Sequence, residues 1–158
     1  MNQFGNGNLI SSNTNIAVLI SDCKFDEVSK IVDFCKSSFQ KVKSIDFCYL
    51  PDYKKYKKPD DIPTFDGVFT FHPKKDLNMF GVIKNKDFKE KFLFKKHTIL
   101  LCSCLKNHKY VNKLIYRKNT DLTVGVENES LPNFAMSFLV ESNNHIDFLK
   151  LAKKYLEK

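Results

Sequence analysis

The chain has 158 residues, of which 42% are hydrophobic, and this length suits one domain with a core of ordinary size. Its 25 lysines and single arginine outweigh 18 acids, so the formal net charge is +8 and anionic partners such as nucleic acid or acidic lipid are favoured. No stretch approaches the ~20 apolar residues of a transmembrane helix, so no membrane span is predicted.

The start of the chain and its cysteines bear on domain organisation and location. Residues 1–14 are polar and rich in glycine and asparagine, which predicts a flexible tail ahead of a single α/β domain over residues 15–158. The tail has no apolar core and does not resemble a secretory signal. The cysteines are odd in number: Cys23, Cys35, Cys48, Cys102 and Cys104. Free thiols in a reducing compartment are the simplest explanation, so we expect a cytoplasmic protein.

The first half of the domain predicts a strand, a helix and a second strand. Residues 16–20 (IAVLI) are apolar on both faces, as in an internal parallel strand. Apolar residues then recur every three or four positions over residues 24–39, which predicts an amphipathic helix with Ser21 and Asp22 near its N-cap. Residues 44–50 (SIDFCYL) form the second predicted strand.

The segment 95–126 has the same arrangement and is the centre of the second half. It predicts a buried strand at 99–105, a helix that begins after Asn107, and a strand at 122–126.

Three further elements are indicated more weakly. Residues 87–94 predict a short helix, residues 134–140 a strand, and Asn143 or Asn144 the N-cap of a terminal helix. Whether residues 65–71 form a sheet strand is left open, and so is the oligomeric state.

Strands and helices thus alternate along most of the chain, a pattern typical of α/β proteins. We expect a single-domain, mostly parallel open sheet of about five strands with helices on both faces, which is a Rossmann-like arrangement.

In such a sheet, ligands bind beyond the carboxyl ends of the strands. Polar residues follow four of the predicted strands and are expected to converge there. The candidate ligand-binding residues are Ser21, Asp22, Ser103, Cys104, His108, Glu127, Glu141 and Asn143. The alternative is that they only cap helices, since most helices begin with such residues. The narrowest candidate is the segment 103–108, where a strand ends and a helix begins.

Motifs for cofactors and metals are missing from the sequence. Neither G-x-G-x-x-G nor a P-loop follows the first strand, so no cofactor is expected. His97, Cys102, Cys104 and His108 are zinc-ligand types, but their spacing lacks C-x2-C pairs, so no metal is predicted. Cys104 precedes a predicted helix N-terminus, where a thiol pKa falls, and is the preferred reactive thiol; otherwise it is a buried core residue.

A lysine-rich loop between the two halves interleaves cations and aromatic rings. Its candidate residues are Tyr53, Lys54, Lys55, Tyr56, Lys57 and Lys58. Such a loop suits contact with a nucleic-acid backbone and stacking on bases. The shortage of arginine argues against this interpretation, because phosphate and base recognition favours arginine. A solvated loop, with lysine enriched by an AT-rich genome, is the alternative.

Three segments of the chain are IAVLIS, SIDFCYL and KKDLNMFGVIKN, and the last of them precedes HTILLCS. Together these segments resemble an uncharacterised family of small Bacteroidota proteins. The most specific part is the K-D-L-N-x-F-G-x-I-K pattern from Lys75 to Lys84. The strand–helix–strand layout of the second half, through Val126, is also similar to the first half of family-9 glycosyltransferases, at the level of the fold only. The resemblance implies an α/β fold and a bacterial cytoplasmic protein, and brings no known activity or catalytic residue.

The sequence identifies no catalytic residue and favours a non-enzymatic binding or accessory protein with an unknown protein partner. One alternative is a nucleic-acid- or ribosome-associated protein that uses the lysine-rich middle of the chain. The other is a small ligand-binding or glycosyltransferase-like domain that uses the carboxyl edge of the sheet.

Overall fold

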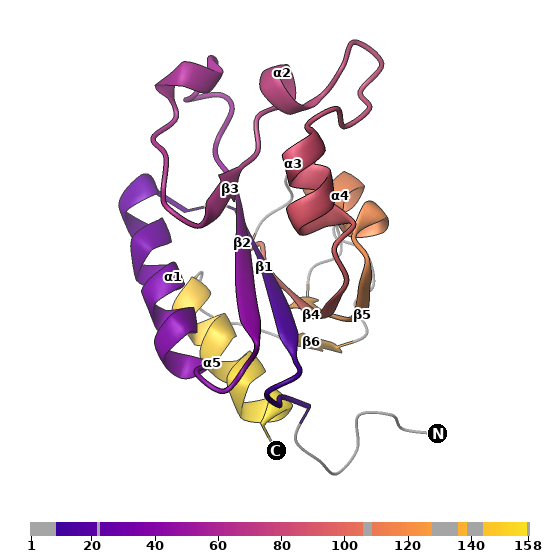
Figure 1. Ribbon diagram of the computed structural model, residues 1–158. Helices are drawn as coiled ribbons and strands as arrows, with labels where there is room; N and C mark the ends of the chain where they lie inside the picture. The colour runs from indigo at the N-terminus through magenta and orange to yellow at the C-terminus, as the bar shows by residue number, and fades with distance from the viewer. Residues whose placement is uncertain (1–8, 22, 106–108, 128–135, 139–143, 158) are drawn as a thin grey trace.

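A six-stranded parallel sheet forms the centre of the computed structural model, which describes residues 9–21, 23–105, 109–127, 136–138 and 144–157 (Figure 1). The strands lie in the order β3-β2-β1-β4-β5-β6, and each neighbouring pair is parallel. Their bounds are β1 (Asn15–Ser21), β2 (Ser44–Leu50), β3 (Val68–Thr70), β4 (His97–Ser103), β5 (Thr120–Val126) and β6 (Met136–Phe138). The predicted α/β fold with a parallel sheet is confirmed.

The strand order places a topological switch point between β1 and β4. From β1 the chain first builds outward through β2 to β3, and it then returns to the other side of β1 to form β4, β5 and β6. The open question about residues 65–71 is answered by β3, which pairs with β2 and lies at the edge of the sheet. In open α/β sheets, the carboxyl ends of the strands at such a switch point form the usual ligand crevice.

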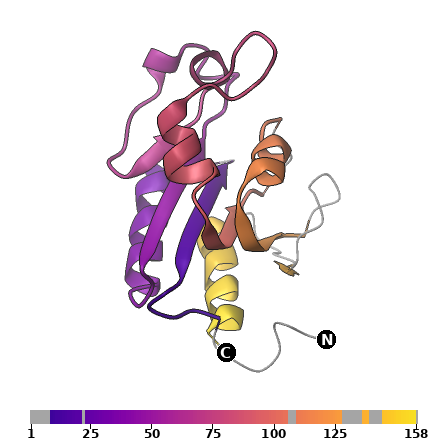
Figure 2. The same cartoon turned by 45° about the vertical axis from the view of Figure 1, so that its right-hand side comes forward.

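Helices cover both faces of the sheet (Figures 1 and 2). On one face, α1 (Phe25–Ser38) lies beside α5 (His145–Leu156). On the other face lie α3 (Lys86–Phe88), the π-helix η2 (Lys89–Leu93) and α4 (Val111–Arg117). Two short helices, the 3-10 helix η1 (Pro59–Asp61) and α2 (Pro73–Asp76), lie between β2 and α3. None of the helices in the described ranges has the length and apolar character needed to cross a bilayer.

The strand side chains alternate between two cores. Val18 and Ile20 of β1 pack toward α1 and α5, whereas Ala17 and Leu19 pack toward η2 and α4. The buried side chains of α1 recur every three or four residues, as the sequence pattern predicted: Val28, Ile31, Val32 and Cys35. Every residue from Ile16 to Ser21 is buried, which agrees with an internal strand covered on both faces.

Several element boundaries differ from the predicted ones. The N-cap of α1 is Lys24, because Ser21 still belongs to β1. The strand β4 begins at His97, two residues before the predicted start, because His97 pairs with Thr120 of β5. The helix predicted at 87–94 is split into α3 and η2, and the amide of Phe94 donates to the carbonyl of Lys89 at 2.7 Å.

Part of the segment predicted as a tail contacts the domain. Ile10 is buried in the core that α1 and α5 share, and the amide of Leu9 donates to the carbonyl of Leu156 at 2.8 Å. Residues 1–8 lie outside the described residues, so the division into a tail and a single domain stays a prediction.

Candidate functional site

The switch point brings together a serine and a histidine. Ser103 is the last residue of β4, and its register partner on β1 is Ile20, so Ser21 comes next to the same place. The Ser103 Oγ lies 2.6 Å from Nδ1 of His145, the first residue of α5, and both residues are buried. Asn144 caps α5, since its side chain accepts from the amides of Ile146 and Asp147. The contact between Ser103 and His145 places the N-terminus of α5 against the end of β4.

The other residues predicted for this edge have different outcomes. Cys104 is fully buried, with its Sγ 3.8 Å from the carbonyl oxygen of Leu19, and Glu127 is exposed after β5. The remaining predicted residues, Asp22, His108, Glu141 and Asn143, lie outside the described residues. A serine hydroxyl that contacts a histidine ring is found in nucleophile–base pairs of enzymes. The same two polar groups can also bind a polar ligand by hydrogen bonds.

Sequence reasoning singled out Ser103 but not its partner His145. The two residues are 42 positions apart, and no local pattern joins them. Only the packing of α5 across the end of β4 brings the imidazole to the hydroxyl.

A second polar group, the Asp46 cluster, consists of Asp46, Lys95, His97 and Lys118. The Asp46 carboxylate of β2 accepts from the Lys95 ammonium at 2.8 Å and lies 2.7 Å from Nε2 of His97. The Lys118 ammonium donates to the backbone carbonyls of Lys95 and Asn119 and lies 5.5 Å from the ring centroid of Phe92. The cluster joins β2, the start of β4 and the end of α4.

The electrostatics of the cluster follow from burial and from these contacts. Burial alone would raise the pKa of Asp46, but the hydrogen bonds from His97 and Lys95 outweigh it and hold the pKa below its usual value. Burial lowers the pKa of Lys118 to about 8, and the Asp46 carboxylate opposes that shift only partly. The cluster therefore contains a carboxylate that its neighbours hold in the ionised form and a lysine, Lys118, whose burial favours loss of its proton.

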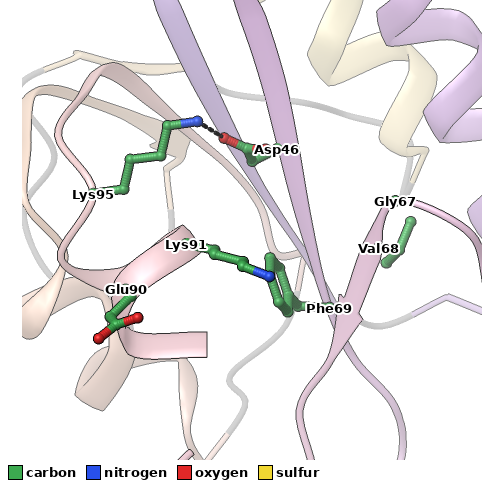
Figure 3. Close-up of a pocket in the computed structure, with 7 residues that line it drawn as sticks. All are labelled: Asp46, Gly67, Val68, Phe69, Glu90, Lys91 and Lys95. Atoms are coloured by element: carbon green, nitrogen blue, oxygen red, sulfur yellow. Dashed lines mark hydrogen bonds and ion pairs between the residues drawn. The ribbon is translucent and has the colours of Figure 1, made fainter. Parts of the chain in front are cut away.

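A pocket of about 530 Å³ opens beside the Asp46 cluster (Figure 3). It lies between η2 and the edge strand β3, and its lining residues are Asp46, Gly67, Val68, Phe69, Glu90, Lys91 and Lys95. Its volume is within the range of small-ligand sites, yet it lies away from the carboxyl edge that the sequence indicated. In the sequence, the sign of this pocket is Asp46, an acidic residue within the mostly apolar strand β2.

The lysine-rich loop after β2 is anchored by its first tyrosine. The Tyr53 hydroxyl donates to the carbonyl of Phe71 at 2.5 Å, and its ring lies edge-on to those of His72 and Tyr110. Burial raises the pKa of Tyr53 far above its ordinary value. The carbonyl of Tyr56 lies 3.1 Å from Nε2 of His72. The four lysines of the loop are exposed to solvent: Lys54, Lys55, Lys57 and Lys58.

A third feature is the loop of residues 77–83, between α2 and α3, which we call the 77–83 loop. Leu77 and Ile83 close it with an antiparallel bridge. Inside it, the Asn78 side chain accepts from the amides of Phe80 and Val82 at 2.9 and 3.0 Å. Gly81 turns the chain with a φ of 74°, which a side chain would strain, and its carbonyl accepts from the Lys113 ammonium of α4.

The base of the 77–83 loop is fixed by a buried carboxylate. Asp76 accepts from the amide of His72 and from the side-chain amide of Asn85, both at 2.7 Å. Its backbone carbonyl accepts from the amide of Lys84 at 2.8 Å. Hydrogen bonds therefore hold both ends of the loop.

The tip of this fixed loop carries two large apolar side chains in solvent. Met79 is 89% exposed and Phe80 is 83% exposed, the highest values among the large hydrophobic residues that the structure describes. The sequence predicted the turn at Gly81 and used the surrounding pattern for a family resemblance, but it gave no reason to regard Met79 and Phe80 as a site. In the described part of the chain, no three potential metal ligands come together.

The model of a family of unknown function (DUF6913) matches residues 4–158. No curated protein and no solved structure matches the chain. The predicted resemblance to an uncharacterised family is confirmed, and because the match covers nearly the whole sequence, the chain belongs to the DUF6913 family of unknown function.

Proposed function

We propose that this chain is a non-enzymatic binding protein that docks onto a larger partner through the 77–83 loop. The observation that carries the proposal is the exposure of Met79 and Phe80 at the tip of a loop fixed by hydrogen bonds. Burying a side chain of this size is worth roughly 1.5–3 kcal/mol, and the fold leaves that free energy unused for both residues. Since the loop is already ordered, binding would cost little additional conformational entropy.

A bacterial cytoplasm is the proposed location. The five cysteines all lie in the described part of the chain and form no disulfide there, and four of them are buried. Burial raises the pKa of Cys35 to about 12 and that of Cys102 well above its ordinary value, so these thiols stay protonated and inert. Such thiols are compatible with the reducing compartment that the family resemblance implies.

The test follows the migration of the tagged chain in a density gradient of native lysate that still contains membranes. We expect the wild type to move from the position of the free chain into larger assemblies, and the variant Met79→Ser/Phe80→Ser to remain at the free position. Phe94→Ser is the matched control, because Phe94 is also apolar and 53% exposed but lies just before β4.

Two outcomes would contradict the docking role. One is a wild-type chain that stays at the free position. The other is a double variant that migrates like the wild type; loss of that shift after nuclease treatment would then indicate nucleic-acid binding through the exposed lysines.

We also propose a second function, the binding of a small polar ligand at the switch point. It is supported by the contact between Ser103 and His145 at the carboxyl edge of a sheet with this strand order. This is the place where ligand-binding and glycosyltransferase-like α/β domains would hold a substrate.

Thermal unfolding in the presence of nucleotides and sugar phosphates tests this second proposal. A ligand present at 100 times its Kd stabilises the folded state by about 2.7 kcal/mol, so a bound compound raises the melting temperature. We expect that rise to shrink in Ser103→Ala and to persist in Ser37→Ala, which removes a hydroxyl from the exposed side of α1. An unchanged melting temperature with every compound, or an equal rise in both variants, would exclude the site.

A further inference from the structure

We infer that the partner of the 77–83 loop is the surface of an anionic lipid bilayer, into which Met79 and Phe80 insert. The inference rests on the proposed docking role of the loop and assigns the chemistry of the partner. Three observations carry it: the shape of the apolar tip, the charge around its base, and the position of the lysine-rich loop.

The apolar tip is too small and too convex for an ordinary protein interface. Met79 and Phe80 are adjacent residues within the turn that the Asn78 side chain and Gly81 form. A stable protein–protein interface buries about 800 Å² on each partner, whereas one large aromatic side chain contributes only about 150–250 Å². A bilayer needs no complementary pocket, because the lipids move apart around an inserted side chain.

The charge around the base of the loop suits an anionic surface. Between Pro73 and Lys86 the chain has four exposed lysines: Lys74, Lys75, Lys84 and Lys86. The only acid in this segment is Asp76, which is buried and hydrogen-bonded. Lys75 lies 3.9 Å from the Asp76 carboxylate and Lys86 lies 3.9 Å from that of Glu90, just beyond the segment. With four lysines and one aspartate, residues 73–86 still have a formal net charge of +3, which suits attraction to acidic lipid headgroups beside an inserted apolar side chain.

The lysine-rich loop adjoins this base. Tyr53 and Tyr56 bind Phe71 and His72, the residues directly before α2, through the contacts described above. The exposed lysines that lie between and after these tyrosines thus belong to the same end of the molecule as the 77–83 loop (Figure 1). Lysine serves as well as arginine here, because attraction to a charged bilayer needs point charges and no bidentate geometry.

A single tryptophan tests the insertion directly. The chain contains no tryptophan, so Phe80→Trp provides one fluorescent reporter at the tip. With phosphatidylcholine vesicles that contain roughly 30% phosphatidylglycerol, we expect the emission to shift to shorter wavelength and to be quenched by brominated acyl chains. Pure phosphatidylcholine is expected to give a much weaker effect. Phe94→Trp is the matched reporter away from the tip, and its emission should not change.

Vesicle co-sedimentation measures the contributions of the tip and of the lysines. Met79→Ser/Phe80→Ser is expected to weaken binding by about 100-fold or more, since two side chains leave the acyl region. Replacing Lys54, Lys55, Lys57 and Lys58 by glutamine is expected to weaken binding by about fivefold per lysine in contact with the surface, and to reduce its salt dependence. Because all these residues are exposed, the melting temperatures should remain those of the wild type.

The results separate this inference from the proposed docking role. If the emission of Phe80→Trp does not change when anionic vesicles are added, while the lysate migration still depends on Met79 and Phe80, the partner is a protein and the lipid inference is overturned. If neither vesicles nor lysate components bind the loop, both are overturned. Binding to vesicles that is unchanged in Met79→Ser/Phe80→Ser would also overturn insertion, since lysines alone would then explain it.

Discussion

Replacing Phe92 by alanine is expected to lower the free energy of unfolding by about 3–5 kcal/mol. Phe92 is 1% exposed and fixes η2 to the sheet. Its ring stacks on Phe88 at a centroid distance of 5.6 Å and lies 5.8 Å from the ring of His97, with the Lys118 ammonium 5.5 Å from its centroid. Truncation would leave a cavity next to buried polar groups, and the surrounding β4 and β2 side chains cannot collapse into it without breaking the Asp46 cluster.

Chemical denaturation of the Phe92→Ala variant measures this loss. Phe94→Ala is the control, because the same truncation two residues later removes a side chain that is half exposed. We expect that control to stay within about 0.5 kcal/mol of the wild type. Equal losses in the two variants would mean that η2 does not pack against the sheet as described.

Replacing Asp76 by alanine is expected to lower the free energy of unfolding by about 3 kcal/mol and to release the 77–83 loop. The carboxylate accepts two short hydrogen bonds, from the His72 amide and from the Asn85 side chain, and its residue is 2% exposed. Hydrogen bonds to a charged group contribute roughly 1.5–3 kcal/mol each, and alanine would leave both donors without their acceptor. Because the Asn85 side chain also caps α3, the loss would extend to the start of that helix.

Denaturation and limited proteolysis together report on this change. The variant is expected to be cut within the 77–83 loop under conditions in which the wild type is not. Asp87→Ala is the matched control, since Asp87 is exposed and forms only a 3.8 Å surface ion pair with Lys91. We expect the control to change stability by no more than about 0.5 kcal/mol. A wild-type cleavage pattern in Asp76→Ala would show that the loop does not depend on this carboxylate.

The proposals for docking and for lipid binding depend on the order that Asp76 maintains. A loop that samples many conformations would lose entropy when its tip is buried, so Asp76→Ala should weaken docking even though Met79 and Phe80 remain. This links the stability of the loop to its function through one buried residue.

The sequence alone determined the layers of the fold, because burial on both faces leaves a direct signal. The continuous apolar run of β1 predicted an internal strand, and the three- and four-residue spacing in α1 predicted a helix with one buried face. Such signals arise from contacts that every residue of an element makes with its layer, so they survive without knowledge of the partner. The turn at Gly81 was also predictable, since few residues other than glycine adopt a positive φ easily.

The candidate sites were decided by tertiary structure, because their members come from distant segments. Asp46 and His97 are 51 residues apart, and Ser103 and His145 are 42 apart, so no spacing rule could pair them. The exposure of Met79 and Phe80 could not be predicted from the sequence either, since L-N-M-F-G-V-I is a mostly apolar pattern that is typical of a buried segment. Only the closing of the loop on itself, through Asn78 and the Leu77–Ile83 bridge, turns Leu77 and Ile83 inward and leaves the two residues at the tip in solvent.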